Sequence, residues 1–376
     1  MNTGRHLRDH LVDGLEWLEL IGRQTRALRA PVPRTRTFFG DDSVAWVGRL
    51  ERRDGPLGAL LRHRWTGDSL LTGDRTDPLR SRAPVDVLLP GVRRNRERTR
   101  FRAFRLGLTG RSPLAVAGVE RPDPTTATTM VDGPEVQRRF REVGAFVVPR
   151  CRDQGSCRRE DRVLDWVVED MLPGRPVAVA ERQDAAAEAL HLLAATWTRL
   201  SLRHRPLPSR VRERARTAFA ALLERAPAGT WAHGVPEASL GARVDRLLAS
   251  TRPVTVGPTH GDPTLSNLLR MPDGRLGLVD WELARERLLG HDVGKVLRTT
   301  PDPRALLPEL VPPDPVRAAM VRVDALPWRH QVAQALLVFL SGWEHRHRRS
   351  VAAGHQAYAV ASLRRTVELL DLLTDD

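Results

Sequence analysis

The sequence HGDPTLSN at residues 260–267, followed by LVDWE at residues 278–282, decides how the rest of the chain is interpreted. The two stretches interrupt a part of the chain that otherwise has the pattern of long helices, and the turn sequence PDGR separates them. Carboxylate and amide oxygens, without thiolates, suit a hard cation such as Mg²⁺, which takes one or two carboxylates together with substrate phosphate oxygens. The pattern therefore predicts a magnesium site in this polar insertion.

The spacing of the polar residues suggests which role each of them would take in catalysis and metal binding. Asp262 and Asn267 stand five positions apart on one loop, so the carboxylate of Asp262 can face a hydroxyl nucleophile while the amide oxygen of Asn267 holds a cation nearby. Asp280 arrives on the second piece of a hairpin, from which it can complete the metal site.

HGDPTLSN followed by LVDWE resembles the catalytic and metal-binding segments of the aminoglycoside phosphotransferase and choline kinase family. The resemblance implies that Asp262 is the catalytic residue, that Asn267 and Asp280 bind Mg²⁺, and that Glu282 assists the metal or the substrate. In the later segment GHDVGK it implies that Asp292 braces the catalytic loop. The fold implied is α+β, a two-lobed protein-kinase-like fold with a β-rich N-terminal lobe and a mostly helical C-terminal lobe.

Patterns along the chain agree with this order of β-rich and helical parts. Short apolar pieces between residues 34 and 100 predict strands, TTATTMV (125–131) predicts a further strand, and CRDQGSCRRED (151–161) predicts a polar loop. Beyond Arg175, helical periodicity predicts long helices. These are Asp184–Arg203, Val211–Ala226, Leu240–Ser250, His330–Arg348 and Gln356–Leu373.

We divide the sequence into an N-terminal extension of unknown role (1–99), a nucleotide-binding lobe with its hinge (100–172) and a helical catalytic lobe (173–376). EVQRRFREVGAF resembles the family's helix that carries a glutamate, for which Glu135 and Glu142 are both candidates. VVEDMLPGRP resembles the linker between the lobes, whose backbone holds adenine in such folds. This implies nucleotide contacts at four successive linker residues, Glu169, Asp170, Met171 and Leu172.

One expected residue is missing from the sequence. A kinase of this type places a lysine on its third strand, where it pairs with the nucleotide phosphates and with the helix glutamate, but Lys295 is the only lysine of this chain. An arginine such as Arg111 or Arg121 could supply the charge, or glycine-rich backbone around Gly107 and Gly110 and the metal could hold the phosphates alone. The remaining alternative is that the protein has lost turnover.

The composition argues against several other classes of protein. The net charge of +14 suggests nucleic-acid binding, but acidic residues are interspersed with the arginines, as in RREDR (158–162), which is typical of solvated surfaces. Cys151 and Cys157 lack the paired spacing of a zinc site, and we expect free thiols. No run reaches the about 18 apolar residues that span a bilayer, and no secretory signal is recognisable, so we expect a cytoplasmic protein without a membrane partner.

Together these features predict an Mg²⁺-dependent enzyme that transfers the γ-phosphoryl group of ATP to a hydroxyl. The resemblance implies a small-molecule acceptor, such as an antibiotic, an amino alcohol or a sugar, and a peptide acceptor stays open. The alternative is a pseudokinase-like binding or scaffold protein that lacks turnover. The missing lysine favours this alternative. An arginine-rich nucleic-acid binder is a third and weaker alternative.

Overall fold

In the computed structural model, the chain forms two compact units. The first unit comprises Met1–Glu142, Phe146–Pro176 and Leu269–Ala284, and the second comprises Val143–Ala145, Val177–Leu268 and Arg285–Asp376. The described residues are 17–18, 20–25, 35–39, 44–49, 85–90, 93–95, 98–105, 114–125, 128–231, 235, 237–310, 321–352 and 354–375, those between 35 and 105 as backbone only.

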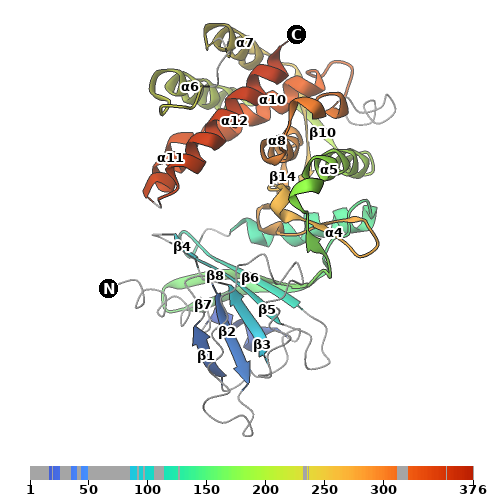
Figure 1. The fold of residues 1–376 in the computed structure, drawn as a ribbon, viewed down its shortest axis with the longest axis vertical. Helices are drawn as coiled ribbons and strands as arrows, with labels where there is room; N and C mark the ends of the chain where they lie inside the picture. The colour runs from blue at the N-terminus through green and yellow to red at the C-terminus, as the bar shows by residue number, and fades with distance from the viewer. Residues whose placement is uncertain are drawn as a thin grey trace. The chain divides into compact units, whose positions relative to one another are not determined.

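The first unit is built on one antiparallel sheet (Figure 1). Its strand order is β1-β2-β3-β5-β6-β8-β7, and the short β4 pairs with β5. The strands are β1 Thr35–Phe39, β2 Val44–Arg49, β3 Val85–Pro90, β4 Arg93–Asn95, β5 Arg98–Arg105, β6 Leu114–Glu120, β7 Cys151–Arg159 and β8 Arg162–Asp170. The boundary that we placed after residue 99 falls inside the β4–β5 hairpin, and β1 to β4 pair within the same sheet as the later strands.

Burial along the strands follows their position in the sheet. β8 has the sequence RVLDWVVED and lies between β6 and the last strand, β7. Six successive residues of it are buried, so both of its faces are covered. β6 alternates between buried and half-buried residues, as expected for a strand with one face on the core. Helix α4, Gly133–Val143, confirms the predicted helix, and its Phe140 packs edge-on against Trp281 with ring centroids 5.1 Å apart.

Two predictions in this unit were wrong. CRDQGSCRRED is strand β7 rather than a loop, and it pairs with β8 from Cys151 to Arg159. As the last strand of the sheet it has one face in solvent, so its polar residues alternate outward, which resembles loop composition. TTATTMV forms no strand in its described part, because Thr129–Val131 is a 3₁₀ helix. Cys151 and Cys157 are free thiols.

The polar insertion forms the hairpin that its turn sequence predicted. β12, Leu268–Arg270, and β13, Leu276–Leu278, lie in a three-stranded sheet with β9, Arg175–Pro176. Gly274 takes a φ of +84° in the turn, and its N–H donates to the carbonyl of Met271 at 2.9 Å.

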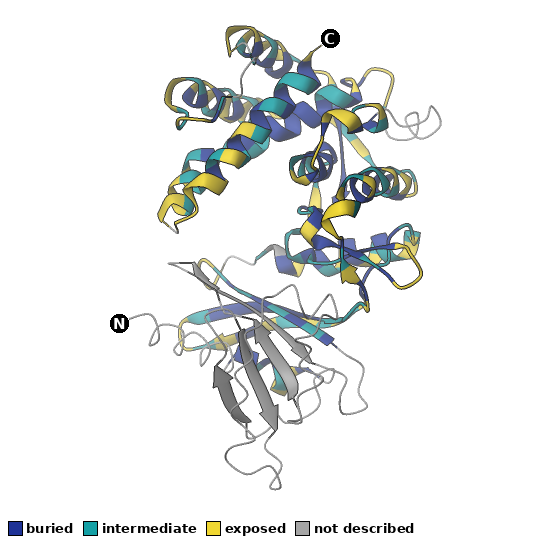
Figure 2. Cartoon of the chain, in the orientation of Figure 1, coloured by how far each residue is buried: buried dark blue, intermediate teal, exposed yellow. Residues whose placement is uncertain are grey.

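The second unit is helical, with one small sheet. Its helices are α5 Arg182–Trp197, α6 Ser209–Arg225, α7 Glu237–Ala249, α8 Gly290–Thr299, α10 Trp328–Leu340, α11 Trp343–Ala352 and α12 Gln356–Thr374. β10, Arg203–Pro206, β11, Pro253–Thr259, and β14, Arg285–Leu288, form an antiparallel sheet with β11 in the middle. Figure 2 shows α10 buried along most of its length, as expected for a central helix that is apolar nearly all round.

The chain breaks one helix that we predicted as continuous. His330–Arg348 consists of α10, which ends at Leu340, and α11, which begins at Trp343. Ser341 and Gly342 form the break, and both flanks have helical composition, so periodicity alone does not show it. Within the described residues, no helix combines the length and the apolar character that crossing a membrane requires.

Candidate active site

The sequence HGD forms the turn that leaves the central strand of the small sheet. β11 ends at Thr259, His260 is fully buried, and Gly261 takes a φ of +86°. This left-handed conformation favours glycine because a Cβ atom would clash with the backbone. The sharp turn takes Asp262 out of the core, and the Asp262 side chain is 28% exposed.

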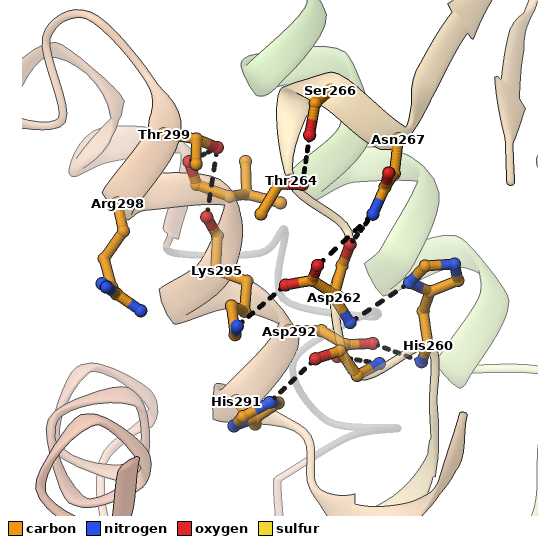
Figure 3. A network of polar contacts seen from close by, with 12 residues as sticks. His260, Asp262, Thr264, Ser266, Asn267, His291, Asp292, Lys295, Arg298 and Thr299 are labelled. Carbon is orange, nitrogen blue, oxygen red and sulfur yellow. Dashed lines mark hydrogen bonds and ion pairs between the residues drawn. The ribbon is translucent and has the colours of Figure 1, made fainter. Parts of the chain in front are cut away.

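Asp292 holds the backbone of this turn, as the resemblance implied. Its carboxylate accepts the backbone N–H of His260 at 2.7 Å and that of Gly261 at 2.8 Å (Figure 3). His260 adds a third contact, because its Nδ1 accepts the N–H of Asp262 at 3.2 Å. Burial raises the pKa of Asp292 to about 6, although both backbone donors favour its charged form. The turn is thus fixed through its backbone, and the Asp262 carboxylate is left for other partners.

Asn267 lies directly beside Asp262, as the spacing predicted. It ends the 3₁₀ helix Leu265–Asn267, and its Nδ2 donates to the Asp262 carbonyl at 2.8 Å and lies 3.4 Å from Asp262 Oδ2. Because the amide nitrogen faces Asp262, the amide oxygen points elsewhere, and it accepts no hydrogen bond from the described part of the chain. A hard oxygen without a protein partner fits the predicted role of a Mg²⁺ ligand.

The only lysine of the chain makes an ion pair with Asp262, which we did not predict. Lys295 lies on α8, and its Nζ is 2.8 Å from Asp262 Oδ1 (Figure 3). Burial lowers the pKa of Lys295, and the Asp262 charge opposes this shift. The i to i+3 spacing from Asp292 to Lys295 places both residues on one helix face. This spacing is the feature of the sequence that could have placed Lys295 near the HGD turn. Asp262 is therefore held on one side by Lys295 and on the other by Asn267.

Asp280 and Glu282 belong to the first unit, on either side of Trp281. Asp280 takes a φ of +75°, and among described non-glycine residues only Glu160, in the β7–β8 turn, is also left-handed. Such a conformation costs about 1–3 kcal/mol and is concentrated at functional sites. No group of three or more His, Cys, Asp or Glu side chains suited to a metal occurs in the described ranges. The predicted set of two carboxylates and an amide, from both units, stays a prediction.

Arg121, our candidate for the missing lysine, is engaged by protein partners. Its Nε donates to Asp165 at 2.9 Å, its Nη2 to Ser156 at 2.9 Å and its Nη1 to the Pro124 carbonyl at 3.1 Å. Burial acts to raise the pKa of Asp165, but the hydrogen bonds that it accepts from Arg121, Ser156 and Thr128 outweigh burial and lower that pKa. A role of Arg121 toward nucleotide stays a prediction.

Strand β6 itself carries no lysine or arginine. The strand that precedes α4 is β6, and its sequence LAVAGVE contains neither lysine nor arginine. Arg111, Gly107 and Gly110 lie outside the described residues.

The two candidate glutamates of α4 and the glutamine between them have different partners. Glu135 and Glu142 are exposed and both pair with Arg138, whereas the buried Gln137 donates from its Nε2 to Glu169 Oε1 at 2.6 Å. Hydrogen bonds from Arg138 and Arg139 lower the pKa of Glu135 to about 2. Gln137 is therefore the side chain of α4 that reaches strand β8. Asp170 ends β8, and Met171 and Leu172 follow it. The role of Glu169–Leu172 as a nucleotide-binding linker stays a prediction.

The family model described as "Phosphotransferase enzyme family" matches residues 91–313. The chain belongs to this family. The resemblance drawn from HGDPTLSN and LVDWE is confirmed, as is the α+β, protein-kinase-like fold class. No curated protein matches this member of the phosphotransferase enzyme family.

Several solved structures are similar to this phosphotransferase-family chain. The apo form of a thermostable mutant of aminoglycoside phosphotransferase APH(4)-Ia is 16% identical, over 73% of this chain and 92% of its own, with a TM-score of 0.44. Macrolide 2′-phosphotransferase MphH from Brachybacterium faecium is 17% identical, over 70% and 88%, with a TM-score of 0.38. Choline kinase LicA from Streptococcus pneumoniae is 12% identical, over 72% and 89%, with a TM-score of 0.40.

A cavity of about 720 Å³ in this phosphotransferase-family chain includes Asp262 in its wall. Its described lining comes from the second unit, namely the HGD turn with the residues that follow it and helices α5, α8, α10, α11 and α12. Phe339 and Trp343 supply apolar wall, and Tyr358, the only tyrosine of the sequence, lines it while remaining 74% exposed. The volume is that of a small-molecule site.

Proposed function

We propose that this protein transfers the γ-phosphoryl group of ATP to a hydroxyl of a small molecule. The observation that carries the proposal is the placement of Asp262, whose carboxylate lines the 720 Å³ cavity and is held by Lys295 and Asn267. Family membership over residues 91–313 supports the same reaction class. A fixed carboxylate next to a pocket for the acceptor is what a kinase needs to orient a hydroxyl.

The reaction assigns Asp262 one proton. The acceptor oxygen forms a bond to the γ-phosphorus, the bond from that phosphorus to the bridging oxygen breaks, and ADP leaves with the bridging oxygen. The hydroxyl proton goes to the Asp262 carboxylate, which acts as acceptor of the proton and as orienting group. Lys295, at 2.8 Å, fixes the direction in which Asp262 Oδ1 points.

The proposed reaction also requires Mg²⁺ and a bound nucleotide. Asn267 and Asp280, with Glu282 nearby in sequence, would hold Mg²⁺, since their oxygens match its preference. The ion would neutralise charge on the phosphates. Backbone groups of Glu169–Leu172 would hold the adenine. The absence of a lysine before residue 295 favours the second candidate, a binding protein without turnover.

Replacement of Asp262 tests the reaction. Acceptors are screened with labelled ATP, and Asp262→Asn is expected to lower kcat about 10²- to 10⁴-fold. ATP affinity should stay unchanged, because the variant loses the proton acceptor and the charge that pairs with Lys295 but none of the proposed nucleotide contacts. Asp273→Asn, in the exposed PDGR turn, is the matched control and should keep activity within about twofold. Unchanged kcat in Asp262→Asn would refute the proposed role, and ATP binding without any turnover would favour the second candidate.

A further inference from the structure

The cavity beside Asp262 has an unbalanced charge. Five cationic side chains line it, from α5, α8, α11 and α12: Arg182, Lys295, Arg298, Arg346 and Arg365. Asp262 is the only carboxylate among the described residues of the lining. Since Lys295 already pairs with Asp262 and Arg365 with Glu368 at 3.4 Å, the other arginines need a different partner.

Arg298 and Arg346 have no carboxylate partner in the described part of the chain. Arg298 donates from Nη2 to the Ser362 hydroxyl, and its buried Nε has no hydrogen-bond partner. Arg346 donates from Nη2 to the Phe339 carbonyl. Neutral oxygens do not compensate a full charge, and donors remain on both guanidinium groups.

One aromatic ring lies among these cations. The Phe339 centroid is 4.2 Å from Arg298 Cζ, 4.0 Å from Arg346 Cζ and 5.0 Å from Lys295 Nζ. The ring face attracts each cation, but the cations repel one another. Burial, and then the charge of Arg298, lowers the pKa of Arg346 to about 10. Like charges gathered in a cavity indicate that a ligand of opposite charge belongs there.

We propose that the phosphoryl acceptor carries an anionic group, a carboxylate or a phosphate or sulfate ester, that binds Arg298 and Arg346. Planar guanidinium groups bind such anions through two parallel hydrogen bonds. The inference rests on the proposed function and specifies its substrate class. Of the predicted acceptor types, a cationic amino alcohol would meet repulsion in this cavity.

Three alcohols of equal shape test the charge of the acceptor. They are para-(hydroxyethyl)benzoate, the corresponding benzamide and the corresponding benzylammonium, each with one hydroxyl. For the unsubstituted protein, kcat/KM is expected to be highest for the benzoate, about tenfold above the benzamide, and lowest for the benzylammonium. An equal or reversed order would overturn the proposal.

Two substitutions assign the effect to residues. Arg298→Gln and Arg346→Gln should each lower kcat/KM for the benzoate about tenfold, leave the benzamide value unchanged and leave KM for ATP unchanged. Arg349→Gln, an exposed charge on α11 outside the cavity, is the matched control. Arg298→Lys and Arg346→Lys keep the charge and should recover part of the benzoate activity if the glutamine variants fail to fold.

Binding of benzoate to the nucleotide-free protein, measured by calorimetry, separates this inference from the proposed function. Arginine-dependent binding without turnover of any alcohol would keep the anion site and refute the kinase reaction. Turnover that favours the neutral or cationic alcohol would refute the anion site and keep the kinase. If the arginine substitutions raise KM for ATP instead, the cations bind nucleotide phosphate, and the proposal is overturned.

Discussion

Single side chains around the HGD turn determine which groups near Asp262 carry a charge. His291 lies on α8 with its Nε2 3.0 Å from both Arg287 Nη1 and the Gly261 carbonyl. Burial, and then the charges of Arg287 and Lys295, lowers the pKa of His291 to about 3. The imidazole is therefore neutral at physiological pH, and the cations around Asp262 do not include it.

We expect His291 to make stability depend on pH. Its pKa is lower in the folded state than the unfolded value of 6.5, so the folded state binds fewer protons and stability is lost as pH falls below 6.5. The loss is about 1.4 kcal/mol per pH unit. Urea unfolding of the unsubstituted protein and of His291→Gln at pH 7 and pH 5 measures the difference. A difference in unfolding free energy that does not change with pH would contradict the assignment.

At the scale of elements, helix α8 carries Asp292, Lys295 and Arg298 and depends on its contact with α10. A Cβ atom on Gly290 would lie 2.7 Å from the Gln331 carbonyl oxygen and 2.8 Å from Val332 Cα. Both are backbone atoms that cannot move without shifting a helix. This glycine therefore fixes the distance between α8 and α10.

Alanine substitutions at two glycines should have opposite effects. Gly290→Ala is expected to destabilise the protein by about 1–3 kcal/mol through overpacking, and to lower activity because α8 positions Asp292 and Lys295. Gly241→Ala, inside α7, meets only Leu223 at an ordinary 3.8 Å and should stabilise by about 0.5–1 kcal/mol. Thermal unfolding and kcat of both variants provide the test, and equal effects of the two substitutions would refute the packing argument.

Elements with strong local signals were predictable from the sequence, and contacts between elements were not. Helical periodicity identified α12, and PDGR identified the β12–β13 hairpin, because each signal lies in a few neighbouring residues. Strand β7 was missed because half of an edge strand faces water. The ion pair of Lys295 with Asp262 was missed because it joins residues 33 positions apart. The spacing within α8 shows which helix face carries Lys295, but it does not show which residue lies opposite.

At the scale of the whole molecule, the proposed metal ligands come from both compact units. Asn267 belongs to the second unit and Asp280 to the first. If both bind the same Mg²⁺, their contributions to metal binding are coupled. A double-mutant cycle measures such a link without any assumption about distance.

We expect Asn267→Ala and Asp280→Ala to weaken Mg·ATP binding non-additively. Each variant should lose affinity, and the double variant should lose less than the sum, with a coupling energy of about 1 kcal/mol or more. Calorimetric titration with ATP in the presence of Mg²⁺, and again in EDTA, separates the metal-dependent part. Additive losses, or equal losses in EDTA, would show that the two residues do not share an ion.

Tyr358 gives the cavity a built-in reporter. Because it is the single tyrosine of the chain and its ring is largely open to water beside the arginines, ring-labelled protein yields one tyrosine spin system in NMR spectra. Its chemical shift would follow the filling of the cavity during titration, with no dye or extra substitution required.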